Sequence, residues 1–162
     1  MESTIQQKSQ YHLDLEAQYG AHDYHPLPVV LAKGDGVYLW DVEGKKYYDF
    51  LSAYSAVNQG HCHPKIIETI KEQVSTLTLT SRAFHNNRLG EYLKFTTEYF
   101  GFESLLPMNT GAEGVETAIK ITRKWGHTIK GIPEGQAHIV VCDNNFHGRT
   151  TTIISFSSDA GS

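Results

Sequence analysis

Apolar residues recur every three or four positions in several stretches of the chain, which is the pattern of helices with one buried face. The clearest stretch starts at Pro64, a residue that suits the first position of a helix. Its apolar positions are Ile66, Ile67, Ile70, Val74 and Leu77. A second helix is predicted over residues 89–100, with Gly101 ending it, and a third over residues 112–125. Residues 1–20 show a weaker version of the pattern.

Two other patterns predict strands. Residues 37–40 and 46–50 are aromatic and β-branched and flank a polar turn, so they predict a hairpin, and the preceding Pro26 and Pro28 favour an extended path. Residues 139–142, "IVVC", form a continuous apolar run that is typical of a buried parallel strand. The order of helix, strand and loop favours a doubly wound α/β sheet. Such a sheet needs several parallel strands and this chain supplies about two, so we expect the protein to be incomplete.

Composition narrows the class of protein. The 162 residues are 40% hydrophobic and 20% charged, as in soluble globular domains. A net charge of -4 with scattered basic residues argues against nucleic acid as a partner, and no apolar run approaches the ~20 residues that span a membrane. Cys62 and Cys142 form no disulfide framework. Residues 1–20 resemble neither a signal nor a transit peptide, so we expect a cytoplasmic protein, or a mitochondrial matrix protein if a transit peptide has been removed.

The third helix begins with an unusual stretch, "NTGAEG", at residues 109–114. The first N–H groups of a helix lack internal partners and attract anions, and Gly111 would let a phosphate approach the backbone. Thr110 could add its hydroxyl. The alternative is that Thr110 only caps the helix, which is the commoner role for such a residue.

The loop after the apolar run, "NNFHGRT" at residues 144–150, is a second candidate. Loops at the carboxyl ends of parallel strands carry ligands in open α/β sheets. Phe146 could stack on a planar ring, and Arg149 could bind a carboxylate through two hydrogen bonds. A core phenylalanine beside a surface arginine is an equally good interpretation of this loop alone.

The sequence "HCHP" suggests a metal site made of His61, Cys62 and His63, but adjacent residues rarely converge on one ion. We therefore expect no metal. His63 and Pro64 are better explained as the turn that starts a helix.

Four segments together resemble the class III branch of the pyridoxal-phosphate-dependent aminotransferases, and within it the members that act on ornithine. The segments are "YGAHDYHPLPVVLAKGDGVYLWDVEGKKYYDFLSAYSAVNQGHCHPKI", "LTLTSRAFHNN", "LPMNTGAEGVETAIKITRKWG" and "NNFHGRT". The resemblance runs from residue 13 to residue 159, and the terminal "DAGS" departs from the family pattern. It implies a fold-type I transferase that is incomplete. Residues 1–55 would belong to the small domain, and residues 56–162 would begin the large cofactor-binding domain.

The resemblance also implies roles for individual residues. Thr110, Gly111 and Ala112 would hold the phosphate of pyridoxal 5'-phosphate, and Phe146 would stack on its ring. The residues that would line the substrate pocket are Tyr24, Tyr54 and Arg149, with Arg149 on the α-carboxylate of ornithine. This chain would contain no catalytic residue, because the lysine that forms the Schiff base with the cofactor is expected beyond residue 162.

The implied reaction moves the δ-amino group of L-ornithine to 2-oxoglutarate and gives glutamate 5-semialdehyde and glutamate, a step that joins arginine metabolism to proline biosynthesis. The resemblance also implies a homodimer or a higher homo-oligomer. Two alternatives stay open. One is a related ω-aminotransferase that acts on acetylornithine or 4-aminobutyrate, and the other is a fragment that acts only in binding or dimerisation.

Overall fold

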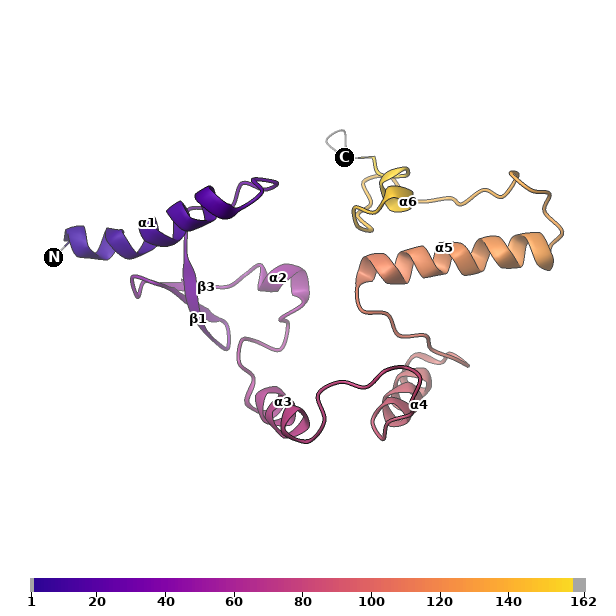
Figure 1. The fold of residues 1–162 in the computed structure, drawn as a ribbon, viewed down its shortest axis with the longest axis horizontal. Coiled ribbons are helices and arrows are strands. Elements are labelled where there is room, and N and C mark those ends of the chain that lie inside the picture. The colour runs from indigo at the N-terminus through magenta and orange to yellow at the C-terminus, as the bar shows by residue number, and fades with distance from the viewer. Residues whose placement is uncertain (1, 159–162) are drawn as a thin grey trace. The chain divides into compact units, whose positions relative to one another are not determined.

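The computed structural model describes residues 2–158 and divides by contacts into two units, Met1–Phe84 and His85–Ser162 (Figure 1). The expected boundary between small and large domain, at residues 55 and 56, stays a prediction. Residues 159–162, where the sequence departs from the family pattern, lie outside the described residues.

The first unit combines a long helix with a small sheet. Helix α1 (Glu2–Tyr19) precedes three antiparallel strands in the order β1 (Leu31–Asp35), β2 (Tyr38–Asp41) and β3 (Lys46–Tyr48). The predicted hairpin is confirmed as β2 and β3, with Tyr38 opposite Tyr48. Strand β1 was missed, because its sequence "LAKGD" contains no aromatic or β-branched residue.

The turn between β2 and β3 is built around Asp41. One carboxylate oxygen, Oδ1, accepts the N–H groups of Glu43 and Lys45 at 3.0 and 2.8 Å. The other, Oδ2, accepts the Tyr47 hydroxyl at 2.7 Å. Helix α1 joins this turn through the Ser9 N–H, which donates to Glu43 Oε1 at 2.8 Å. The turn therefore orders the hairpin and also holds the helix beside it.

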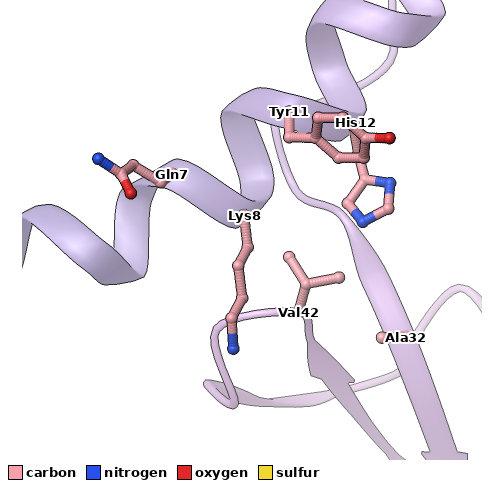
Figure 2. Close-up of a pocket in the computed structure, with 6 residues that line it drawn as sticks. All are labelled: Gln7, Lys8, Tyr11, His12, Ala32 and Val42. Atoms are coloured by element: carbon pink, nitrogen blue, oxygen red, sulfur yellow. The ribbon is translucent and has the colours of Figure 1, made fainter.

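An open hollow of about 500 Å³ lies between α1 and the sheet. Its lining residues are Gln7, Lys8, Tyr11, His12, Ala32 and Val42. Figure 2 shows the His12 ring directed from α1 toward the strand that carries Ala32, while Lys8 extends past Val42. None of the predicted site residues lines this hollow.

The chain then forms a short turn and a helix. Helix α2 (Ser52–Ser55) is left-handed: its four residues have φ angles of 48°, 48°, 56° and 69°, and none of them is glycine. Left-handed backbone costs an L-residue roughly 1–2 kcal/mol, so this turn must be held by its surroundings. Helix α3 (Pro64–Thr76) starts at Pro64 as predicted.

The second unit contains α4 (Leu89–Phe100), α5 (Gly111–Thr128) and α6 (Thr151–Ile154). Gly101 ends α4 in a left-handed conformation, as its position predicts. After α5 the chain returns along that helix, so that α6 lies beside its N-terminal end (Figure 1). The two buried apolar side chains of the described residues, Ile119 on α5 and Ile153 on α6, belong to this unit.

The expected parallel strand at residues 139–142 is wrong: the segment has no regular secondary structure and pairs with no described strand, and Val140 is 94% exposed. A strand exists only with a hydrogen-bonded neighbour, and the described residues offer none here. Residues 2–158 alone do not form a doubly wound sheet, which agrees with the expectation of an incomplete α/β fold. Among residues 2–158, no helix is both long and apolar enough to cross a bilayer.

Candidate functional site

The start of α5 is a complete capping box. The Glu113 N–H donates to the Thr110 hydroxyl at 3.1 Å, and the Thr110 N–H donates back to Glu113 Oε2, also at 3.1 Å. Glu113 Oε2 accepts the Asn109 N–H as well, at 2.8 Å. The capping interpretation of Thr110 is therefore confirmed. The pattern Thr-x-x-Glu could have revealed it in the sequence.

Capping leaves two donors of the helix start without partners. The N–H groups of Gly111 and Ala112 donate to no group among the described residues. A Cβ placed on Gly111 would meet no atom within 4 Å, so the space over this turn is open. Two outward N–H groups at the positive end of an 18-residue helix are the kind of arrangement that attracts anions. Capping and anion binding thus use different N–H groups and are compatible.

The loop that carries Phe146 and Arg149 is fitted against this helix start. Gly148 has a φ of +125°, and a Cβ added to it would lie 2.9 Å from the Cβ of Ala112. Only glycine tolerates both that angle and that approach. The Thr150 hydroxyl also donates to the Glu116 carboxylate on α5. Sequence analysis missed the role of Gly148, because its partner lies 36 residues earlier in the chain.

Phe146 and Arg149 contact one another in this loop. The guanidinium carbon of Arg149 lies 5.4 Å from the centre of the Phe146 ring. The ring is 74% exposed in this chain, so that one of its faces is open to a ligand. Arg149 forms no ion pair with any described carboxylate. Its charge is therefore available for an anionic ligand beside the ring.

The two predicted tyrosines belong to the first unit. Tyr24 is exposed in the segment between α1 and β1, and Tyr54 is exposed in the left-handed turn of α2. Asp49 lies just before that turn, and its carboxylate accepts the N–H groups of Leu51 and Ser52 at 3.1 and 2.8 Å. Its other oxygen is 2.7 Å from His61 Nε2. The Ser52 N–H, and next His61, hold the pKa of Asp49 below its usual range against the opposing effect of burial.

The structure assigns the "HCHP" segment to packing. His61 contacts Asp49 and pairs through its backbone with Gly36, and Cys62 is exposed. His63 stands at the N-cap position of α3 but makes no capping hydrogen bond through its side chain. Over the described range, no three side chains of His, Cys, Asp or Glu gather where they could hold a metal ion.

Comparison with known proteins places these residues in one family. Residues 19–161 match the class-III aminotransferases. The chain is 62% identical over 147 residues to a protein named ornithine aminotransferase, mitochondrial, from Drosophila ananassae. That alignment covers 91% of this chain and 34% of the relative.

Solved structures agree with this match. A structure named acetylornithine aminotransferase, from Elizabethkingia anophelis, is 65% identical with a TM-score of 0.82, over 94% of this chain and 38% of that one. An ornithine aminotransferase from Toxoplasma gondii, described as having partial occupancy of pyridoxal phosphate at its active site, is 44% identical with a TM-score of 0.91. It is covered over 35% of its length, and this chain over 93%. The chain thus spans about a third of the length of its relatives.

Proposed function

This chain belongs to the class-III aminotransferase family, and from that membership we propose that it forms the N-terminal third of an ornithine aminotransferase. The complete enzyme would transfer the δ-amino group of L-ornithine to 2-oxoglutarate, giving glutamate 5-semialdehyde and glutamate. The single observation that carries the proposal is the placement of the Phe146–Arg149 loop against the open start of α5. The reaction would join arginine metabolism to proline biosynthesis.

Class-III aminotransferases use pyridoxal phosphate, and the residues of the second unit fit it. The unpartnered N–H groups of Gly111 and Ala112 would bind the phosphate, with the Thr110 hydroxyl beside them. The exposed face of Phe146 would lie against the ring. When bound, the cofactor supplies the electron sink that amino transfer requires.

The remaining predicted residues would bind and orient the amino donor. Arg149 carries a guanidinium without a carboxylate partner in residues 2–158, which suits the α-carboxylate of ornithine. Tyr24 and Tyr54 would offer hydroxyl groups and ring faces to its α-ammonium group. None of these residues is assigned a proton-transfer step. Within this proposal, the lysine that attaches the cofactor belongs to the rest of the enzyme.

A second candidate has its own support, because the relative that is 65% identical is named an acetylornithine aminotransferase. Both donors present an α-carboxylate, so Arg149 would serve either one. They differ at the α-nitrogen, which is a cation in ornithine and a neutral amide in acetylornithine. The tyrosines favour the cation. A fragment that acts only in binding is the third interpretation.

The test is a comparison of amino donors in the full-length enzyme. We expect kcat/KM to be highest for ornithine, with acetylornithine and 4-aminobutyrate well below it. Arg149→Ala should raise the KM for ornithine about ten- to a hundredfold, the value of a charge-assisted contact of ~1.5–3 kcal/mol. Arg123→Ala, on the exposed surface of α5, is the control and should change nothing. A preference for acetylornithine would establish the second candidate instead.

For compartment and assembly we propose the mitochondrial matrix and a homodimer. Relatives from flies, rat, worm and Arabidopsis carry "mitochondrial" in their names, which gives no support to the cytoplasmic location expected from the first residues. Cell fractionation tests the compartment, and light scattering of the purified enzyme tests the dimer.

A further inference from the structure

The turn that carries Tyr54 adopts an unfavourable backbone and is held from one side by a single carboxylate. Residues Ser52–Ser55 are left-handed, and the N–H groups that enter this turn, those of Leu51 and Ser52, both donate to Asp49 Oδ1. Asp49 is itself fixed to the sheet, because its N–H donates to the Val37 carbonyl at 2.9 Å. Asp49 therefore connects the sheet to the conformation of the turn.

His61 completes this arrangement from a distant part of the chain. Its Nε2 lies 2.7 Å from Asp49 Oδ2, on the side of the carboxylate that the turn does not use. Its backbone exchanges two hydrogen bonds with Gly36, at 2.8 and 3.0 Å. The ring also packs against Gly34, where an added Cβ would lie 2.7 Å from both Cβ and Cγ of His61. The sheet thus sets the position of the imidazole, and the imidazole sets the orientation of the carboxylate.

From this geometry we infer that Asp49 and His61 form a positioning pair that holds the Tyr54 turn in the conformation needed to bind the amino donor. The inference rests on the proposed function in one respect, the role of Tyr54 in the donor pocket. It also assigns a role to the "HCHP" segment, because His61 of this segment orients the Asp49 carboxylate. In this inference His61 is a positioning residue, and it acts on the donor only through Asp49 and the turn.

A general structural role would have different consequences. If the pair only stabilised the first unit, its loss would loosen the sheet and α3 as much as the turn. If it positions Tyr54, its loss frees residues 50–57 selectively and weakens donor binding. Hydrogen exchange and a comparison of two half-reactions separate these cases.

The experiment uses the full-length enzyme with Asp49→Ala, Asp49→Asn and Gly34→Ala. Alanine removes every acceptor, asparagine keeps one oxygen for the Leu51 and Ser52 N–H groups, and Gly34→Ala displaces His61 without touching Asp49. Asp35→Ala is the matched control, because Asp35 is an exposed acid in the same sheet whose side chain forms no hydrogen bond with a described residue. Tyr54→Phe gives the effect of the tyrosine itself.

We expect Asp49→Ala to speed hydrogen exchange in residues 50–57 but not in α3, and to raise the KM for ornithine about tenfold, the loss of roughly one well-formed contact. The half-reaction with glutamate should change much less. Asp49→Asn should fall between wild type and Asp49→Ala, and Gly34→Ala should act in the same direction. If Asp49→Ala does not fold, the other two variants carry the test.

Two results would overturn the inference. One is exchange that rises equally in residues 50–57 and in α3, with both half-reactions weakened alike. The other is faster exchange in residues 50–57 with an unchanged KM for ornithine. An enzyme that does not use ornithine would refute the proposed function instead, and hydrogen exchange would still report whether the pair holds the turn.

Discussion

At the scale of single residues, the position of the loop at residues 144–150 depends on the absence of a side chain at Gly148. Gly148→Ala would place a Cβ 2.9 Å from the Cβ of Ala112 at a φ of +125°. The loop must then move away from the start of α5 and take Phe146 and Arg149 with it. We expect affinity for pyridoxal phosphate to fall at least about tenfold in the full-length enzyme, because a contact of ~1.4 kcal/mol or more would be lost.

The measurement is a cofactor titration followed by absorbance, and Gly131→Ala is the matched control. Gly131 also has a positive φ, +68°, but an added Cβ there meets nothing within 4 Å. Gly131→Ala therefore introduces the strain of a positive φ without introducing a close contact. Equal losses of affinity in the two variants would mean that the angle matters and the approach to Ala112 does not.

A substitution at Gly111 tests whether the start of α5 binds the cofactor phosphate. The backbone of Gly111 is not left-handed and a Cβ has room, so Gly111→Val should leave α5 folded and instead fill the space that a phosphate needs. We expect cofactor affinity to fall by ~2–4 kcal/mol, the value of one or two charge-assisted contacts. Titration of pyridoxal phosphate with circular dichroism on the same samples measures both quantities.

Gly90→Val is the control for Gly111→Val, because Gly90 also lies in the first turn of a helix and has open space around it. It should change stability by a similar small amount and leave cofactor affinity unchanged. Unchanged affinity in Gly111→Val, with a lower Tm, would leave capping as the only role of this helix start.

At the scale of elements, the stability of the hairpin of β2 and β3 depends on pH through Asp41 and Tyr47. The Tyr47 hydroxyl lowers the pKa of Asp41 more than any other group does, and burial opposes it. The hydrogen bond with Asp41 in turn raises the pKa of Tyr47. The lowered pKa means that stability from Asp41 is fully present above its usual value of about 3.9 and is lost as pH falls through its folded-state value. The raised pKa of Tyr47 means that the contribution of Tyr47 to folding stability is present below about pH 10 and is lost as pH rises further.

We therefore expect Tyr47→Phe to lower the Tm of the full-length enzyme at neutral pH, with a difference from wild type that shrinks once Asp41 is protonated. Tm recorded from about pH 2 to about pH 7 provides the measurement, because the lowered pKa of Asp41 requires points well below its usual value of about 3.9. Tyr48→Phe is the control, because the Tyr48 hydroxyl pairs with Tyr38 and not with a carboxylate. A deficit for Tyr47→Phe that stays constant down to the lowest pH would contradict the expectation.

Local signals predicted those elements that depend on their own residues. Pro64 begins α3, Gly101 ends α4, and the turn at Asp41 closes the hairpin, each as expected. The strand at 139–142 failed because pairing depends on a neighbour that the pattern of a single segment does not reveal. The same reason explains why Asp49 and Gly148 were missed, since each acts through residues that the fold brings close. The roles of Phe146 and Arg149 rest on the family resemblance and stay predictions, because the loop alone leaves them undecided.

At the scale of the whole molecule, the chain leaves most of its apolar faces uncovered. Helix α3 exposes Ile66, Ile70 and Val74, which its pattern marks for burial, and Leu77 directly after the helix is exposed as well. Helix α4 also exposes two aromatic side chains, Phe95 and Tyr99. We expect the 162-residue chain alone to bind the dye ANS, to unfold without a sharp transition and to show no transaminase activity.

Calorimetry, dye fluorescence and an ornithine-dependent absorbance change of added cofactor test these three statements, with the full-length enzyme as the reference. A single sharp heat-absorption peak would show that the chain folds by itself. An absorbance change on addition of ornithine would show that its residues suffice for the chemistry. The first result would contradict the expectation that the chain does not fold by itself, and the second would contradict the expectation that the chain alone is inactive.

The uncovered faces of α3 and α4 also matter before the enzyme is complete. Ribosomes add about 5–20 residues per second, so a chain of this length needs roughly 10–30 s to be made. During that time the β1–β3 meander can form from neighbours in sequence, since its pairings are short-range. The apolar side chains of α3 and α4 stay exposed to solvent or to a chaperone until the rest of the enzyme has been made. Folding of this protein is therefore expected to begin at the hairpin, and chaperone binding at these two helices is expected until the rest of the enzyme covers them.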